Sequence, residues 1–182
     1  KKKKFRNLFA ITKNNVYFNH AGTGPININT KKAIEECIKI YQTRAEFDFK
    51  TYFEKLKESR KVFARLINAE PEEIAFIQNT SHGIYIALMN LPLINRDEII
   101  VMNEVFPAVR YVVQYNLPGV YKKFINFCGK DPLTILKIVR ENMTKKTRAV
   151  IIDSTQFFTG EMIDLLPLSE FLRNRGIYLI VD

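Results

Sequence analysis

The sequence contains no tryptophan and only two cysteines in 182 residues. Cys37 and Cys128 are too few for a disulfide framework, so we expect a reducing, cytoplasmic setting. No apolar run approaches the roughly 20 residues that cross a bilayer, which argues against a membrane-spanning helix. The basic residues 1–4 precede a short apolar run that Arg6 and Asn7 interrupt. No small-residue cleavage site follows it, so a signal peptide is not expected either.

The charge of the chain is basic, because 28 lysines and arginines stand against 19 acidic residues and give a net charge of +9. Residues 1–4 are all lysine and carry four of these charges. A basic balance is compatible with nucleic-acid binding. The sequence has no zinc-ligand spacing, aromatic RNA-binding motif or helix-turn-helix signature, so we expect neither a nucleic-acid partner nor a metal. A hydrophobic content of 47% indicates a globular chain.

Two helical patterns occupy the N-terminal part of the chain. In the first, apolar residues recur at intervals of three and four over residues 34–45, with Asn29 or Thr30 as the N-cap. The second covers residues 52–67 and is predicted to end near Asn68. Both patterns are typical of structural helices.

A break at residues 70–73 predicts a boundary between an N-terminal segment with helices, 1–70, and a larger domain, 71–182. Beyond it, apolar runs of strand length alternate with helical patterns. The predicted strands are 74–77, 98–102, 120–127, 148–153 and 177–181. Four helices are predicted. The first starts near Ser81, and the second covers 108–115. The third covers 131–142 with Asp131 as N-cap, and the fourth covers 167–174 with Gly176 as C-cap. This alternation predicts an α/β three-layer sandwich with a mostly parallel sheet.

Polar or aromatic residues follow the predicted strands. Residues 79–83, NTSHG, are predicted to begin a helix, and two interpretations of them are open. They either supply only the N-cap, or they form an anion-binding site from the Thr80 and Ser81 hydroxyls and the free N–H groups of the helix. The other strand ends are residues 103–107, residues 153–160 and Asp182. Because ligands of open α/β sheets bind outside the carboxyl ends of the strands, we expect these segments to meet at one crevice.

A loop near the N-terminus, residues 16–25, contains two glycines that let the backbone come close to a ligand. His20 in this loop is either a proton carrier or a histidine that hydrogen-bonds within the loop, and the sequence alone leaves both open.

Four segments, in this order, resemble the class V aminotransferase family of pyridoxal 5′-phosphate (PLP) enzymes, which includes cysteine desulfurases, kynureninase and isopenicillin N epimerase-like proteins. The segments are VYFNHAGTGP, IQNTSHGI, NEVFPAV and AVIIDSTQFFTGEMIDLLPLSEFLRNRGIYLIVD. The resemblance implies an incomplete PLP-dependent transferase-like large domain preceded by N-terminal helices. It also implies a homodimer that acts on an amino acid as a transaminase, lyase, desulfurase or epimerase.

The resemblance assigns cofactor contacts residue by residue. Thr80 and Ser81, with the backbone N–H of Ser81 or His82, are expected to hold the phosphate. Phe106 is expected to lie against the pyridine ring, and Gln156 to make a polar contact with the ring hydroxyl or the substrate.

Asp182 is expected to lie beside the ring nitrogen, where a carboxylate favours the protonated ring and makes it a better electron sink. The loop with Asn19, His20 and Gly22 is expected to approach the substrate carboxylate.

The sequence also departs from the family pattern. His82 stands where many relatives have an acidic residue, and Ser154 where many have histidine. Phe106, in place of histidine, points towards the kynureninase or epimerase-like branch. In the family the Schiff-base lysine follows the strand that ends in Asp, and no lysine here matches it. We therefore expect Asp182 to end a fragment that is inactive alone; the alternative is a noncatalytic PLP-fold binding or scaffold protein.

Overall fold

The structure is a computed structural model that describes residues 5–44, 48–127 and 129–182. The expectations for residues 1–4, Ala45 and Cys128 fall outside these ranges. The chain forms two compact units, Lys1–Ala75 and Phe76–Asp182. None of the helices in the described ranges combines the length and apolar character needed to span a membrane.

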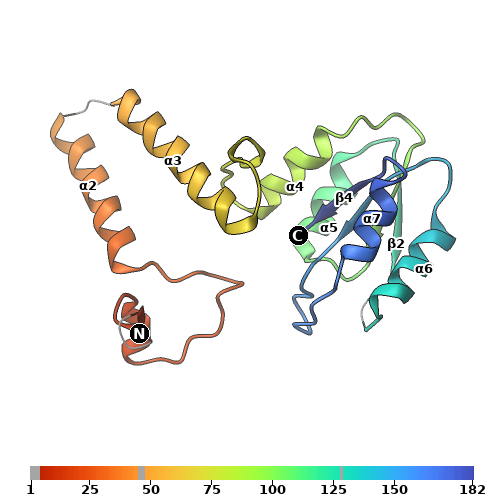
Figure 1. Ribbon diagram of the computed structural model, residues 1–182, viewed down its shortest axis with the longest axis horizontal. Coiled ribbons are helices and arrows are strands. Elements are labelled where there is room, and N and C mark those ends of the chain that lie inside the picture. Colours follow the sequence, from red (N-terminus) through yellow and green to blue (C-terminus); the bar gives the residue numbers. More distant parts are fainter. Residues whose placement is uncertain (1–4, 45–47, 128) are drawn as a thin grey trace. The chain divides into compact units, whose positions relative to one another are not determined.

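Two long helices dominate the first unit, as predicted (Figure 1). Its elements are η1 (Ala10–Lys13), α2 (Ile28–Arg44), α3 (Phe49–Ile67) and η2 (Pro71–Glu73). The N-cap predicted at Asn29 or Thr30 is wrong: the Asn27 side chain accepts hydrogen bonds from both of their N–H groups at 2.9 Å. Asn68 ends α3 in the left-handed conformation, with φ of 56°, which confirms the predicted terminus.

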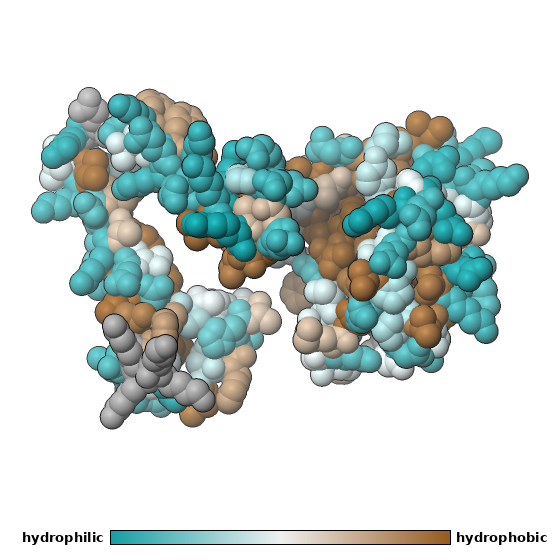
Figure 2. Space-filling model, viewed as in Figure 1, coloured by the Kyte–Doolittle hydropathy of each residue, from teal (hydrophilic) through white to brown (hydrophobic). Residues whose placement is uncertain are grey.

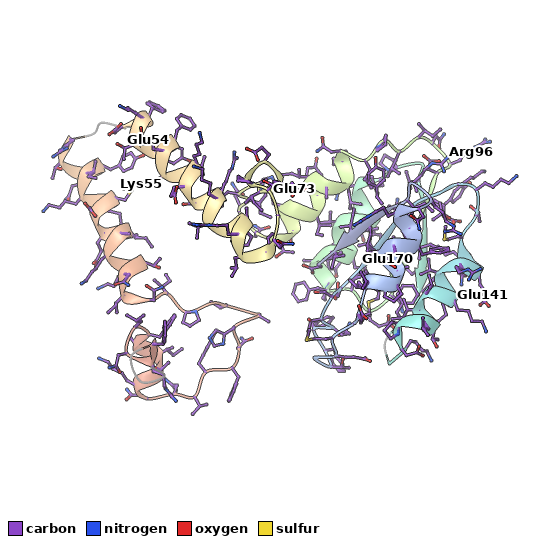
Figure 3. All side chains as sticks on the ribbon, viewed as in Figure 1. Glu54, Lys55, Glu73, Arg96, Glu141 and Glu170 are labelled. Atoms are coloured by element: carbon purple, nitrogen blue, oxygen red, sulfur yellow. The ribbon has the colours of Figure 1, made fainter. Side chains whose placement is uncertain are left out.

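Much of the apolar surface of the first unit is exposed. Figure 2 shows brown, apolar side chains along α2 and α3, and Ile38, Phe53 and Leu66 are among those that are more than half exposed. At the end of this unit Glu73 accepts the N–H of Glu70 at 2.8 Å and so fixes the turn of η2 (Figure 3).

A parallel four-stranded sheet forms the centre of the second unit, with strand order β2-β1-β3-β4. The elements in chain order are α4 (Thr80–Met89), β1 (Glu98–Met102), α5 (Pro107–Asn116), β2 (Tyr121–Ile125), α6 (Pro132–Asn142), β3 (Thr147–Ile152), α7 (Leu166–Arg173) and β4 (Tyr178–Val181). Asp131 caps α6 as predicted, because its carboxylate accepts the N–H groups of Leu133 and Thr134 at 3.1 Å.

Helices cover both faces of this sheet. Residues 99–102 of β1 and 149–152 of β3 are fully buried, although successive residues of a strand point to opposite faces. Helix α4 packs against α5, and α6 packs against α7. Their inward residues, among them Val113, Val139 and Leu172, belong to the same apolar core. This is the predicted α/β three-layer arrangement with a parallel sheet.

Residues 74–77 do not form the predicted strand. Ile74 is extended, with φ of −100° and ψ of 122°, but the run pairs with no strand in the described ranges. Phe76 and Ile77 are 53% and 45% exposed. An apolar run becomes a strand only where a neighbour takes its backbone hydrogen bonds, and the apolar pattern does not reveal whether that neighbour is present.

The C-cap of α7 is Asn174 and not the predicted Gly176. Gly176 lies two residues later with φ of 64°, and its N–H donates to the Arg173 carbonyl at 3.1 Å. Glycine is favoured here because the turn from α7 into β4 needs a left-handed residue.

Candidate functional site

The strand order identifies one edge of the sheet as the candidate site. The chain passes from β1 to β2 on one side of β1 and then to β3 and β4 on its other side, so the direction of winding reverses between β1 and β3. Open α/β sheets bind ligands outside the carboxyl ends of the strands at such a reversal. Residues 103–106 follow β1, residues 153–165 follow β3, and Asp182 follows β4.

Asp153 is the buried centre of this edge, with only 2% of its surface exposed. Its Oδ2 accepts the backbone N–H of Phe106 at 3.0 Å, which ties the loop after β3 to the loop after β1. Its Oδ1 is buried and has no hydrogen-bond partner among the described residues. A buried carboxylate oxygen without a partner is costly, and such atoms commonly mark functional sites.

Asp182 lies beside Asp153 because of the register between β3 and β4. Ile152 is paired with Val181, so the next residues of the two strands, Asp153 and Asp182, are also neighbours. Paired residues on parallel strands point to the same face, about 4.8 Å apart. The Ser154 N–H and hydroxyl donate to the Asp182 carbonyl at 2.8 and 3.1 Å and hold the strand end in place.

Both carboxylates of the pair have a raised pKa. Burial, together with the charge of Asp182, raises the pKa of Asp153 to about 6, although the hydrogen bond from the Phe106 N–H lowers it. Burial also raises the pKa of Asp182. The pair therefore holds a proton more readily than two exposed aspartates, and it is a preformed acceptor for a cationic group.

Phe106 stands at the start of α5, where it is the N-cap and precedes Pro107. Its ring meets the ring of Phe157 edge to face, with centroids 5.3 Å apart. Phe106 is 45% exposed, so part of its side chain is accessible to a planar ligand.

Gln156 braces the two loops. It is 1% exposed, its Nε2 donates to the Glu104 carbonyl, and its Oε1 accepts the Phe158 N–H at 2.6 Å. Both ends of the amide are thus used by the backbone, whereas the resemblance implied a contact with cofactor or substrate.

The first turn of α4 combines a cap with unused polar groups. Asn79 accepts the His82 N–H at 2.9 Å, so the N-cap reading is confirmed. The hydroxyls of Thr80 and Ser81 have no hydrogen-bond partner within the described part of the chain, and the buried His82 Nδ1 is also unpartnered. Because α4 leads to the amino end of β1, its first turn lies towards the carboxyl ends of the strands. Capping uses one N–H and leaves the others free for an anion.

A cavity of about 530 Å³ adjoins this edge of the sheet. Its lining includes Asn103, Arg110 and Tyr111 from the loop after β1 and from α5, and Gln156 and Phe157 from the loop after β3. Asp153 and Asp182 are not part of its wall. The cavity is therefore next to the carboxylate pair and distinct from it.

The predicted substrate loop belongs to the first unit and is internally ordered. The Tyr17 hydroxyl donates to the carbonyls of Asn19 and Thr23 at 3.0 and 2.6 Å, and the His20 ring meets the Tyr17 ring edge to face at 5.1 Å. A Cβ on Gly22 would lie 2.6 Å from the Asn19 side-chain oxygen. The structure thus brings Asn19, His20 and Gly22 together within this unit.

The sequence reasoning gave no role to Asp153. The sequence did contain a pattern that could have identified it, because two predicted strands are each followed by or end in an aspartate. Parallel strands in register place such residues side by side. The strand order was needed to show that these two strands are neighbours.

The fold is that of PLP-dependent transferases. A mutant of C-DES with glycine covalently linked to its PLP cofactor superposes with a TM-score of 0.85 at 24% identity, over 97% of this chain and 49% of that one. The cysteine desulfurase CsdA from Escherichia coli gives a TM-score of 0.77 at 20% identity, over 100% of this chain and 48% of that one.

Residues 16–182 match the family model of class-V aminotransferases, and the chain therefore belongs to this PLP-dependent family. An uncharacterized aminotransferase of Bacillus subtilis, YcbU, is 24% identical over 135 residues, which are 74% of this chain and 36% of the relative. The (5-formylfuran-3-yl)methyl phosphate transaminase of Methanocaldococcus jannaschii is 29% identical over 115 residues, 62% of this chain and 27% of the relative. The chain thus spans about a third of the length of these curated relatives.

Proposed function

We propose that this protein is a PLP-dependent enzyme that acts on an amino acid, as a transaminase, lyase, desulfurase or epimerase. The main support is the Asp153–Asp182 carboxylate pair at the winding reversal of the sheet, in a chain of the class V family. Family membership also supports a homodimer, and we propose a cytoplasmic location from the scarcity of cysteine.

Asp182 would bind the ring nitrogen of the cofactor. The carboxylate is half-buried, so solvent screens its charge less than that of an exposed aspartate. When bound, PLP supplies a ring that withdraws electrons from the substrate carbon, and it does so best when the nitrogen is protonated. Asp182 would hold that proton in place.

Thr80 and Ser81 would hold the phosphate. Their hydroxyls have no partner among the residues that the structure describes, and the Ser81 N–H is free of the Asn79 cap. The positive end of the α4 dipole also favours an anion. The buried and unpartnered His82 Nδ1 is a further polar atom at this turn.

Phe106 would position the ring by stacking, which contributes about 1 kcal/mol beyond burial. Phe157 packs edge to face with the Phe106 ring, and Gln156 holds the two loops together. We further propose that Asn19, His20 and Gly22 approach the substrate carboxylate; this role rests on the resemblance to the family.

The test is a titration of the complete protein with PLP, followed by a panel of amino acids, with UV–visible absorbance as the readout. We expect saturable PLP binding and a spectral change with at least one amino acid. Asp182→Ala should weaken PLP binding by about tenfold or more, as expected when a charged hydrogen bond is lost. Glu170→Gln, on the exposed face of α7 (Figure 3), is the matched control.

A protein that binds no PLP would refute the proposal. PLP binding without a spectral response to any amino acid would instead favour a noncatalytic protein of the same fold.

A further inference from the structure

We propose that Asp153 is a positioning residue: without touching the cofactor, it sets the charge that Asp182 presents to the ring nitrogen, and it fixes Phe106 through the backbone. The part that concerns the cofactor rests on the proposed function. The carboxylate pair itself is a property of this chain and can be tested without any ligand.

The register of the sheet keeps the two carboxylates together. Asp182 donates its N–H to the Ile152 carbonyl at 3.1 Å and accepts the Ser154 N–H at 2.8 Å, so it is held opposite Asp153 by backbone bonds on both sides. The two side chains therefore remain on one face of the sheet whatever their protonation states.

Within the described ranges, neither Asp153 nor Asp182 forms an ion pair. Residues 103–106 and 153–165, the loops after β1 and β3, contain neither lysine nor arginine. Besides the pair, the charged or titratable groups at this edge are Glu104, Glu161 and Asp164 in the two loops, Arg110 on α5 and His82 on α4. The Glu161 carboxylate accepts the Gly129 N–H and the Asp164 carboxylate accepts the Leu166 N–H, both at 3.0 Å. The Arg110 guanidinium donates to the carbonyl and side-chain oxygens of Asn103 at 3.0 and 2.8 Å. The Glu104 carboxylate accepts the Phe127 N–H at 3.1 Å and is thus committed to the end of β2. His82 belongs to the first turn of α4 and has a buried Nδ1.

Burial decides which carboxyl takes a proton first. Asp153 is 2% exposed whereas Asp182 is only half-buried, so ionisation costs more at Asp153. When the pair holds a single proton, Asp153 carries it and Asp182 stays ionised. When both are ionised, the charge of Asp153 adds to that of Asp182 and strengthens the attraction for a protonated ring nitrogen.

Asp153 also links this charge to the aromatic contact. Its Oδ2 holds the Phe106 N–H at 3.0 Å, and Phe106 begins α5. Substitution of Asp153 should therefore alter both the charge beside Asp182 and the position of the Phe106 ring.

The first test follows the side-chain carboxyl signals of Asp182 by carbon NMR in the complete protein without cofactor, as a function of pH. We expect the Asp182 signal to show a second step near the pH at which Asp153 titrates, and Asp153→Asn to remove that step. An Asp182 titration identical in wild type and Asp153→Asn would overturn the proposal.

The second test measures PLP affinity between pH 5 and pH 8 by fluorescence quenching. Asp153→Asn keeps an acceptor for the Phe106 N–H but removes the charge. It should therefore weaken binding by about three- to tenfold at pH 7.5 and flatten the part of the pH dependence due to Asp153. Asp153→Ala also loses the acceptor and should bind more weakly still, whereas the Glu170→Gln control should match wild type.

If Asp153→Asn keeps the wild-type affinity and pH profile, Asp153 has only a structural role and the proposal fails. If wild type binds no PLP, the proposed function fails, and the titration without cofactor still decides whether the pair exists.

Discussion

At the scale of single residues, Asp153 and Asp182 show that two identical side chains acquire different properties when one is buried more deeply than the other. Both end parallel strands, yet only Asp153 has a carboxylate oxygen that is buried without a partner among the described residues. The amino-acid type alone therefore did not indicate their different environments. The resemblance pointed to Asp182, and the register of β3 and β4 was needed to find Asp153.

Replacing Asp153 with asparagine should change stability in a pH-dependent way. Its pKa in the folded protein is raised to about 6, so the folded state binds the proton more tightly than the unfolded state. The stabilising effect of that proton is fully present below the unfolded pKa of about 3.9 and is lost as the pH rises to about 6. Above pH 6 we expect Asp153→Asn to exceed wild type in unfolding free energy by about 1–2 kcal/mol.

Urea denaturation at several pH values between 4 and 7.5 measures this difference. It should grow from pH 4 to pH 6 and then level off. A constant difference over this range would show that Asp153 has an ordinary pKa.

Gln156 gives a second prediction at this scale. Gln156→Ala removes the partners of the Glu104 carbonyl and the Phe158 N–H and leaves a small cavity, so we expect a loss of about 2–4 kcal/mol of unfolding free energy. Gln114→Ala, on the exposed face of α5, should cost less than about 0.5 kcal/mol. Thermal denaturation of both variants tests this, and equal melting temperatures would contradict the bracing role.

At the scale of helices and strands, the sequence predicted what local chemistry determines. The strand at 98–102 matches β1, and Asp131 and Asn68 stand at helix ends as expected. Residues 74–77 show the limit, because pairing depends on a neighbouring strand that the local pattern does not contain. The cap of α2 was misplaced because Asn27, Asn29 and Thr30 are all good N-caps, and only the backbone decides among them.

The cap of α6 leads to a prediction with the opposite pH dependence. Hydrogen bonds from the Thr134 side chain, then from backbone N–H groups, lower the pKa of Asp131. A lowered pKa stabilises the fold above the unfolded pKa, and that stabilisation is lost as the pH falls through the folded pKa. We expect Asp131→Ala to lower the melting temperature by about 2–6 °C at pH 7, with the difference shrinking as the pH falls below the ordinary pKa of an aspartate.

Glu141→Ala is the control on the same helix (Figure 3). Its exposed ion pair with Lys137, at 3.9 Å, is too long and too well solvated to contribute much. Equal melting temperatures for Asp131→Ala and Glu141→Ala at pH 7 would show that the cap does not stabilise α6.

At the scale of the whole chain, the parallel sheet with helices on both faces could be predicted because continuous apolar strands alternate with helices. The strand order could not, since any order satisfies the same apolar pattern. That order determines where the winding reverses, and so it determines which loops meet at the site. The resemblance thus named Phe106 and Asp182, and the topology added Asp153, which lies beside Asp182 and accepts the Phe106 N–H at the candidate site.

The division into two units predicts how the 182-residue chain responds to a protease. Phe76 lies at the junction of the units, in an extended and unpaired run, and is 53% exposed. The aromatic residues of the second unit that lie in the core, such as Phe127, are protected by burial. Because a protease needs an accessible segment outside the core, limited chymotrypsin digestion should cut early after Phe158, which is 86% exposed in the loop after β3, and after Phe76, while β1 and β3 stay intact. Phe76→Ser should delay the cut at position 76, whereas a first cut within β1 or β3, detected by mass spectrometry, would show that the second unit is not the more stable part of the chain.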